Sequence, residues 1–283
     1  SREIIITNSN FGSAAVDFAV TDKKVSEYFK ASESALFILP GFISSNETGV
    51  NTTLGRGGSD YTAAIIAAAI DAKVLEIWTD VSGMMTADPR VVSNVKIIPQ
   101  ISYQEAMELS HFGAKVIYPP TIQPVRYKGI PTWIKNTFAP QDIGTVIQSD
   151  TNDFENSIRG ISSINNVALL SLEGSGMAGV PGFSKRLFEA LAGKKINVIL
   201  ITQSSSEHSI CVGIDLANAD IARKAIDETF AYKKKTKKVD PLVVETDLAV
   251  IAVVGDNMKN HTGISGKMFG SLGRNGVNIR AIA

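Results

Sequence analysis

Leu54 to Tyr61 read LGRGGSDY, and the run YTAAIIAAAIDA continues from Tyr61 to Ala72. The run is apolar at almost every position, which predicts a helix buried on most of its surface. The glycines before it predict a tight turn, because glycine tolerates positive φ angles. Ser59 or Asp60 could cap this helix by accepting a hydrogen bond from its first N–H groups.

Short apolar segments alternate with helical patterns on both sides of this turn. Strands are predicted at Ala35–Pro40 (ALFILP), Lys73–Thr79 (KVLEIWT) and Ile130–Ile134, and an amphipathic helix at Tyr103–Ser110. Such alternation predicts an α/β fold with a mainly parallel sheet. Ligands of these sheets bind beyond the carboxyl ends of the strands. The unusual segments GFISSNETG and DVSGMMTADPR follow two of the predicted strands directly.

Arg56 is the residue of the glycine turn that turn geometry does not explain. An arginine there can hold a carboxylate through two parallel hydrogen bonds. Gly57 and Gly58 would let a ligand approach the backbone, and the helix N-terminus favours an anion. Asp60 supplies the opposite charge close by, so the turn suits a zwitterion such as a free amino acid. The residues alone leave this interpretation and an ordinary capped turn equally open.

The second half of the chain contains an internal repeat. Residues 167–202 align without a gap with residues 248–283, and Gly174, Gly182 and Asn197 fall on Gly255, Gly263 and Asn278. Each copy predicts a strand, a glycine-rich loop, a helix, a short turn and a strand. The first copy continues through SEHSICVGI and a helix at Asp220–Ala231, which predicts a ferredoxin-like βαββαβ unit. The second copy stops at Ala283, within its predicted second strand, so we expect the native chain to continue.

Composition narrows the function classes. The 28 basic and 28 acidic residues cancel, which predicts no broad attraction to nucleic acid or membrane. No apolar run approaches the roughly 20 residues of a spanning helix. The single cysteine, Cys211, is predicted to be a core residue, and with no signal peptide the chain is expected in the cytoplasm. The polar segment Asp150–Asn156 and the lysine-rich AYKKKTKKVDP are predicted to be linkers. The three histidines show no metal-ligand spacing, so no metal site is predicted.

Three long motifs, GFISSNETGVNTTLGRGGSDYTAA, IWTDVSGMMTADPR and FGAKVIYPPTIQPV, resemble the C-terminal part of an aspartate kinase catalytic domain, which has the amino-acid kinase fold. The repeats resemble the paired ACT domains of that family, which bind an amino-acid inhibitor. VILITQSSSEHSI further resembles the threonine-sensitive enzymes in which the kinase is joined to a homoserine dehydrogenase. The resemblance implies a kinase part at residues 1–150, a first ACT module at 160–232 and an incomplete second module at 245–283.

The resemblance also implies roles for individual residues. Arg56 would hold the α-carboxylate of aspartate, Asp60 would pair with its ammonium, and Phe42 and Ser59 would line the same pocket. Asp60 and Lys115 would be the catalytic residues. The nucleotide would contact Thr79, Asp80, Met85, Arg90, Lys115 and Val116. Met85 stands where related kinases often carry a tyrosine. The inhibitor would contact Gly176, Met177, Gly179, Gly182, Phe183 and Gln203.

The implied reaction transfers a phosphoryl group from ATP, with Mg²⁺, to the side chain of L-aspartate, giving 4-phospho-L-aspartate. Threonine or lysine would inhibit it, and the ACT modules would form a homodimer or a larger homo-oligomer. The family's Lys-Phe-Gly-Gly motif is absent from the sequence, so we expect this chain by itself to be inactive. A non-catalytic, amino-acid-sensing regulatory fragment is the alternative, and a glutamate or uridylate kinase fits less well. The inhibitor, the oligomeric state and the presence of a dehydrogenase domain stay open.

Overall fold

The computed structural model describes residues 1–12, 14–112, 116–149, 157–177, 179–204 and 208–283. Lys115 and the predicted linker Asp150–Asn156 lie outside the described residues. The chain divides into two compact units. The first comprises residues 1–162 and 252–262, and the second comprises residues 163–251 and 263–283.

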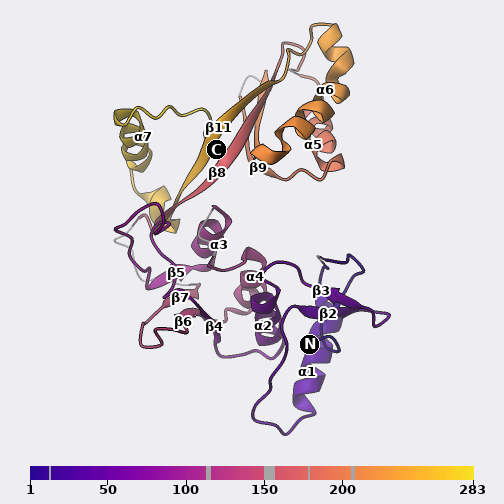
Figure 1. The fold of residues 1–283 in the computed structure, drawn as a ribbon, viewed down its shortest axis with the longest axis vertical. Coiled ribbons are helices and arrows are strands. Elements are labelled where there is room, and N and C mark those ends of the chain that lie inside the picture. Colours follow the sequence, from indigo (N-terminus) through magenta and orange to yellow (C-terminus); the bar gives the residue numbers. More distant parts are fainter. Residues whose placement is uncertain (13, 113–115, 150–156, 178, 205–207) are drawn as a thin grey trace. The chain divides into compact units, whose positions relative to one another are not determined.

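The first unit contains two small sheets (Figure 1). One has the order β1-β2-β3, with β1 parallel to β2 and β2 antiparallel to β3. The other has the order β4-β6-β7-β5, in which β4 and β6 are parallel, β6 and β7 antiparallel, and β7 and β5 parallel. The α/β class is confirmed, with mixed rather than mainly parallel pairing. The strands are Ile6–Thr7, Ile43–Asn46, Asn51–Thr53, Leu75–Thr79, Gln100–Ser102, Thr132–Asn136 and Thr145–Gln148 for β1 to β7.

Four helices accompany these sheets: α1 Phe18–Lys30, α2 Gly58–Ala69, α3 Tyr103–Phe112 and α4 Pro119–Lys128. The apolar run after the glycine turn is α2, and the reason for its composition is that it packs on two sides. Ala64 and Ala67 belong to the core around β4, β6 and β7, whereas Ile65 belongs to a separate core with Ile5 and Leu54. A helix between two cores needs apolar residues around most of its circumference.

The predicted strand Ala35–Pro40 is wrong, because these residues form no strand in the structure. Phe37 packs against Phe29 of α1 with the rings tilted and their centroids 4.4 Å apart, while Leu36 and Ile38 are 78% and 92% exposed. Side chains therefore alternate as in a strand, but the backbone has no ladder partner among the described residues. The next segment, expected to be a ligand loop, instead supplies β2 and the turn into β3.

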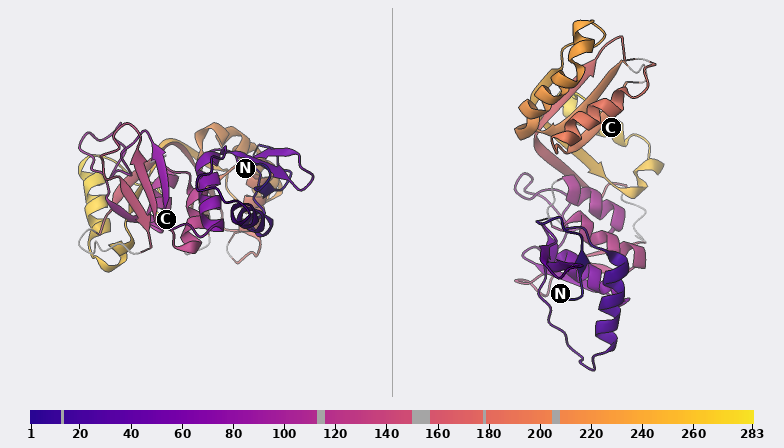
Figure 2. Two further views of the ribbon diagram at one scale, coloured as in Figure 1. Left: turned by 90° about the horizontal axis from the view of Figure 1, so that it is seen from below. Right: turned by 90° about the vertical axis from the view of Figure 1, so that its right-hand side faces the viewer.

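The second unit is built on a sheet of order β11-β8-β10-β9, with antiparallel pairing of β8 with β10 and of β10 with β9. Its strands are β8 Gly160–Glu173, β9 Val198–Gln203, β10 Ser209–Asp215 and β11 Val243–Val254. Helices α5, Phe183–Gly193, and α6, Ala219–Lys235, lie side by side against one face (Figures 1 and 2). Leu170, Leu187, Val212, Ile226 and Phe230 are buried between the helices and the sheet. The predicted ferredoxin-like unit is thus completed by β11.

The repeat is visible in the backbone. Gly182 (φ 79°) and Gly263 (φ 85°) are the left-handed N-caps of α5 and of α7, Ile264–Arg274. The second copy departs from prediction after α7, since residues 277–283 form no strand. In the first copy the matching segment pairs with β10, and the described second copy has no such partner.

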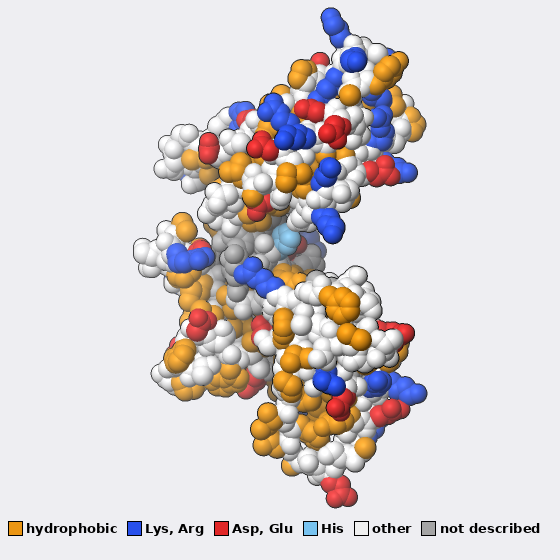
Figure 3. Space-filling model, turned by 45° about the vertical axis from the view of Figure 1, so that its right-hand side comes forward, with side chains coloured by type: hydrophobic (Ala, Val, Ile, Leu, Met, Phe, Trp, Pro, Cys, Tyr) orange, Lys and Arg blue, Asp and Glu red, His pale blue; other side chains and the backbone are white. Residues whose placement is uncertain are grey.

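The described part of the chain also contains two short 3₁₀ helices, η1 Leu216–Asn218 and η2 Asp256–Asn260. The lysine run also departs from prediction. Lys233 to Lys235 form the last turn of α6 rather than a linker, where positive charge complements the helix dipole. Basic and acidic side chains are interspersed on the face shown in Figure 3, in keeping with the zero net charge.

Candidate functional site

The glycine turn is packed tightly against the segment that follows Lys115. Gly57 has φ 66°, and a Cβ built on it would lie 2.4 Å from the Cβ of Tyr118. Only glycine fits there, and the turn is thereby fixed beside the N-terminus of α4. The predicted capping by Ser59 or Asp60 is wrong, because α2 begins at Gly58 and Gly57 is its N-cap. The side chains of Ser59 and Asp60 stand on the first helical turn instead.

Phe42 is held against the same helix end. It has a left-handed backbone, with φ 72°, and its N–H donates to Thr62 Oγ1 at 3.0 Å and to the Gly58 carbonyl at 3.3 Å. A Cβ on Gly41 would lie 2.9 Å from Ser59 Cβ. The structure therefore gathers Phe42, Arg56, Ser59 and Asp60 around the N-terminus of α2, and their roles in ligand binding stay predictions.

The charges of this group are not neutralised within the described structure. Arg56 is exposed and forms no ion pair with any residue that the structure describes. Burial raises the pKa of Asp60 above its usual 3.8, and a hydrogen bond with Ser59 offsets part of that rise. The first N–H groups of α2 have no intrahelical acceptor. A ligand with one carboxylate and one ammonium would match both charges.

The raised pKa of Asp60 yields a test. Because the folded state resists ionisation of this carboxyl group, ionised Asp60 costs stability above pH about 4. Asp60→Asn is therefore expected to raise the melting temperature at pH 7. The difference should vanish at low pH, where Asp60 is protonated in both folded and unfolded chains. Thermal melts of both proteins between pH 3 and 7 measure this, and a variant less stable than wild type at pH 7 would contradict it.

The residues predicted to contact the nucleotide lie at and after the end of β4. Thr79 pairs in register with Asn136, the last residue of β6, and donates from Oγ1 to Asp80 at 3.1 Å. Arg90 is exposed and donates a hydrogen bond from Nη2 to Asp88 Oδ2 at 2.7 Å. This contact lowers the pKa of Asp88. A nucleotide would have to compete with Asp88 for Arg90.

Met85 and Val116 are half-buried. Met85 forms an isolated antiparallel bridge with Ile97, and Val116 packs against the core of the first unit. Both can offer apolar surface, but only Met85 belongs to the turn after β4. Lys115 is outside the described part of the chain.

Sequence reasoning missed a polar network at the same sheet edge. Ser82 Oγ donates to Asp142 Oδ2 at 2.5 Å and accepts from Asn136 Nδ2 at 2.9 Å. Asn136 ends β6, so the rule that ligands meet strand carboxyl ends could have identified it. Among the described residues, no hydrogen bond or ion pair joins this edge to Arg56 or Asp60.

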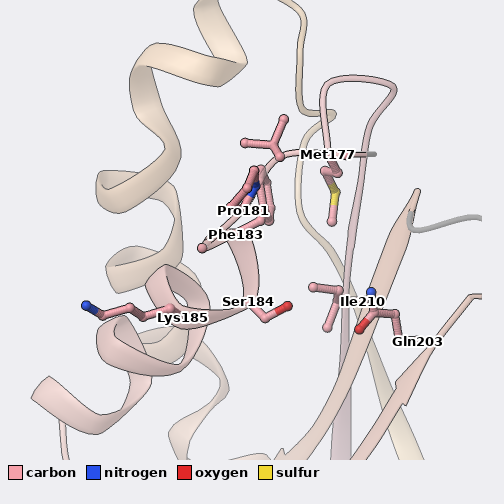
Figure 4. Close-up of a pocket in the computed structure, with 10 residues that line it drawn as sticks. Met177, Pro181, Phe183, Ser184, Lys185, Gln203 and Ile210 are labelled. Carbon is pink, nitrogen blue, oxygen red and sulfur yellow. The ribbon is translucent and has the colours of Figure 1, made fainter.

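A cavity of about 430 Å³ lies in the second unit, between the glycine-rich loop, the start of α5 and the strands β9 and β10. Figure 4 shows the Ser184 hydroxyl and the Gln203 amide at the cavity, with Lys185 leading away from it. Phe183 is buried against Phe230, with ring centroids 4.8 Å apart. The lining residues are Met177, Gly179, Val180, Pro181, Gly182, Phe183, Ser184, Lys185, Gln203 and Ile210.

Five of the six predicted inhibitor contacts line this cavity. Gly176 does not line the cavity. A glycine fits this position for another reason, because a Cβ there would lie 2.5 Å from the Cβ of Lys238. Sequence reasoning did not identify the other five lining residues, which are Val180, Pro181, Ser184, Lys185 and Ile210. The functional roles of all these residues stay predictions.

The described residues contain no group of three or more His, Cys, Asp or Glu side chains placed to bind a metal ion. Asp80 is an exposed carboxylate at the strand end, and Mg²⁺ commonly binds through one carboxylate together with substrate phosphates and water. The residues present therefore fit a metal carried by a nucleotide. None of the described helices combines the length and apolar composition needed to cross a membrane.

Family models and known proteins match this chain along most of its length. The Amino acid kinase family model matches residues 1–136, and the ACT domain model matches residues 170–230 and 251–283. The bifunctional aspartokinase/homoserine dehydrogenase of Haemophilus influenzae is 40% identical over 279 residues, which are 99% of this chain and 34% of that protein.

Two structures of Escherichia coli aspartokinase III are 35% identical to this chain and match 100% of it and 62% of their own chains. The complex with aspartate and ADP has a TM-score of 0.82, and the complex with lysine and aspartate has one of 0.76. The chain spans about a third of the length of the bifunctional aspartokinase/homoserine dehydrogenases that it matches.

Proposed function

Because this chain is a homologue of aspartokinases over its whole length, we propose that it forms part of an enzyme that phosphorylates L-aspartate with ATP. The product would be 4-phospho-L-aspartate. The observation that carries the proposal is that Arg56, which forms no ion pair with a residue that the structure describes, lies beside the half-buried Asp60 at the N-terminus of α2. The structure of E. coli aspartokinase III with aspartate and ADP supports aspartate as the phosphoryl acceptor and an adenine nucleotide as the donor.

The proposed mechanism is one of positioning. Arg56 binds the α-carboxylate with two hydrogen bonds, and Asp60 pairs with the ammonium. With both ends held, the side-chain carboxylate is directed at the γ-phosphorus. This nucleophile is already ionised at neutral pH, so no general base is required. Mg²⁺ on the ATP phosphates, held with help from Asp80, would neutralise the charge that spreads over them.

The activity can be tested in a chimera in which this chain replaces the matching segment of the H. influenzae relative. Every segment that the relative has outside the match is then present. We expect ADP release that depends on L-aspartate and is absent with L-glutamate. A folded chimera that binds ATP but releases no ADP with aspartate would contradict the proposal.

The second candidate function, amino-acid sensing without catalysis, is favoured by the cavity in the second unit. It predicts that the chain binds a regulatory amino acid but that the chimera stays inactive. The two functions are compatible in one enzyme, so the chimera decides between a regulated kinase and a sensor alone.

We further expect homo-oligomers through the ACT modules, which sedimentation of the chain will test.

For the cavity we propose threonine as the ligand. Ser184 and Gln203 can each donate and accept a hydrogen bond, and the start of α5 favours a carboxylate. Among the ten described residues that line the cavity there is no Asp or Glu, and Lys185 is a cation. These residues suit a neutral hydroxyl side chain better than a second ammonium. Lysine, which E. coli aspartokinase III binds, is therefore the less favoured ligand.

Gln203→Ala is expected to weaken threonine binding to the chain by about 5- to 30-fold, since a hydrogen bond to a ligand is worth roughly 1–2 kcal/mol. Titration calorimetry with threonine and lysine measures this. Thr202→Ala is the matched control, because its side chain points to the other face of β9. Threonine affinity that is absent in the wild-type chain, or equal in wild type and Gln203→Ala, would refute the assignment.

A further inference from the structure

Glu105 forms part of the N-terminal cap of α3. In the sequence SYQE, Ser102 Oγ accepts the Glu105 N–H at 3.0 Å, and Glu105 Oε2 accepts the Ser102 N–H at 3.0 Å. This reciprocal arrangement is a capping box, and it starts α3. One carboxylate oxygen is enough for it.

The other oxygen of Glu105 reaches two segments far away in the sequence. Oε1 accepts the Asp256 N–H at 2.8 Å, and Arg159 Nε lies 3.4 Å from it. The two side chains are only 3% and 7% exposed. Burying a charged pair carries a large desolvation cost that a helix cap alone does not require. The pair therefore has a second role.

The residues after Arg159 contact the segment predicted to bind the nucleotide. The Ile161 N–H donates to the Thr86 carbonyl at 2.8 Å, and a Cβ on Gly160 would lie 3.0 Å from the same oxygen. Thr86 follows Met85 directly, and its own N–H donates to the Lys96 carbonyl at 2.9 Å. The backbone of Met85 and Thr86 is thus held on one side by the start of β8.

We propose that the Glu105–Arg159 ion pair positions the Met85–Thr86 segment for nucleotide binding. The contact of Arg159 with Glu105 holds residues 159–161 against α3. The hydrogen bond from the Ile161 N–H then holds the Thr86 carbonyl in place. Glu105 and Arg159 are positioning residues, because neither is near the substrate turn in sequence nor bonded to Arg56 or Asp60 in the described structure. This inference rests on the proposed kinase function and on the nucleotide role of Met85.

The test uses the chimera with Glu105→Gln and Arg159→Lys. Glu105→Gln keeps an oxygen for the Ser102 N–H but removes the charge that faces Arg159. We expect the KM for ATP and the Kd for ADP to rise about tenfold, which is less than the roughly 100-fold loss that a 1 Å misplacement of reacting groups can cause. The KM for aspartate should stay unchanged. Arg159→Lys keeps the positive charge and should give a smaller rise.

Ser102→Ala is the matched control, since it removes the cap hydroxyl and leaves the ion pair. It should lower the melting temperature without changing the KM for ATP. The proposal is overturned if both ion-pair variants bind ADP like wild type, or if the KM values for ATP and aspartate rise together. An unmodified chimera without aspartate-dependent activity would instead sink the proposed function, while ADP binding would still report on the ion pair.

Discussion

Arg56→Ala in the chimera is expected to lower kcat/KM for aspartate by about 30- to 1,000-fold, mainly through a higher KM. The substitution removes a charge-assisted bidentate contact, which is worth roughly 2–4 kcal/mol. Arg56 is exposed and makes no ion pair with a described residue, so its loss should leave folding intact. Steady-state kinetics with varied aspartate and saturating ATP measure the effect.

Arg126→Ala is the control for this experiment, because Arg126 is also exposed but stands in the last turn of α4. Its kinetics should match those of the unmodified chimera. Aspartate kinetics that are unaltered by Arg56→Ala would remove the role assigned to the turn. A fall in kcat with no change in KM would move Arg56 from substrate binding to the reaction step.

Gly57→Ala is expected to destabilise the chain by roughly 2–5 kcal/mol. A left-handed backbone costs a residue with a Cβ about 1–2 kcal/mol, and overpacking adds about 1–3 kcal/mol. Both apply here, because φ is 66° and the new Cβ would lie 2.4 Å from Tyr118 Cβ. Urea unfolding of the first unit measures the change.

Gly129→Ala separates the two causes. Gly129 has φ 65°, and nothing lies within 4 Å of a Cβ built on it. Gly129→Ala should therefore cost only the free energy of the left-handed backbone, about 1–2 kcal/mol. Equal losses for Gly57→Ala and Gly129→Ala would show that Tyr118 does not confine the turn. In that case the packing between the turn and the segment after Lys115 would be absent in solution.

Local patterns predicted much of the first unit. The apolar run after LGRGGSDY is α2, YQEAMELS lies in α3, and KVLEIWT contains β4, each within a few residues of the predicted bounds. These segments have periodicities that tertiary contacts reinforce. The internal repeat likewise predicted a glycine-rich loop followed by a helix in each copy, and Gly182 and Gly263, which it aligns, are the N-caps of α5 and α7.

Predictions that depended on partners far away in the sequence were less successful. Ala35–Pro40 has the composition of a strand, but a strand also needs a neighbour for its backbone. The Ser82–Asn136–Asp142 network joins residues up to 60 positions apart, and no local sequence pattern predicts these hydrogen bonds. Glu105 could be recognised as a capping residue from SYQE, whereas its contact with Asp256, 151 residues away, could not.

The most direct test of the account is the rate of ADP release by the chimera as a function of L-aspartate, with and without threonine. We predict saturable release with L-aspartate, no release with L-glutamate, and inhibition by threonine that Gln203→Ala relieves. Release that is independent of aspartate, or that glutamate supports equally well, would contradict the substrate assigned to Arg56 and Asp60.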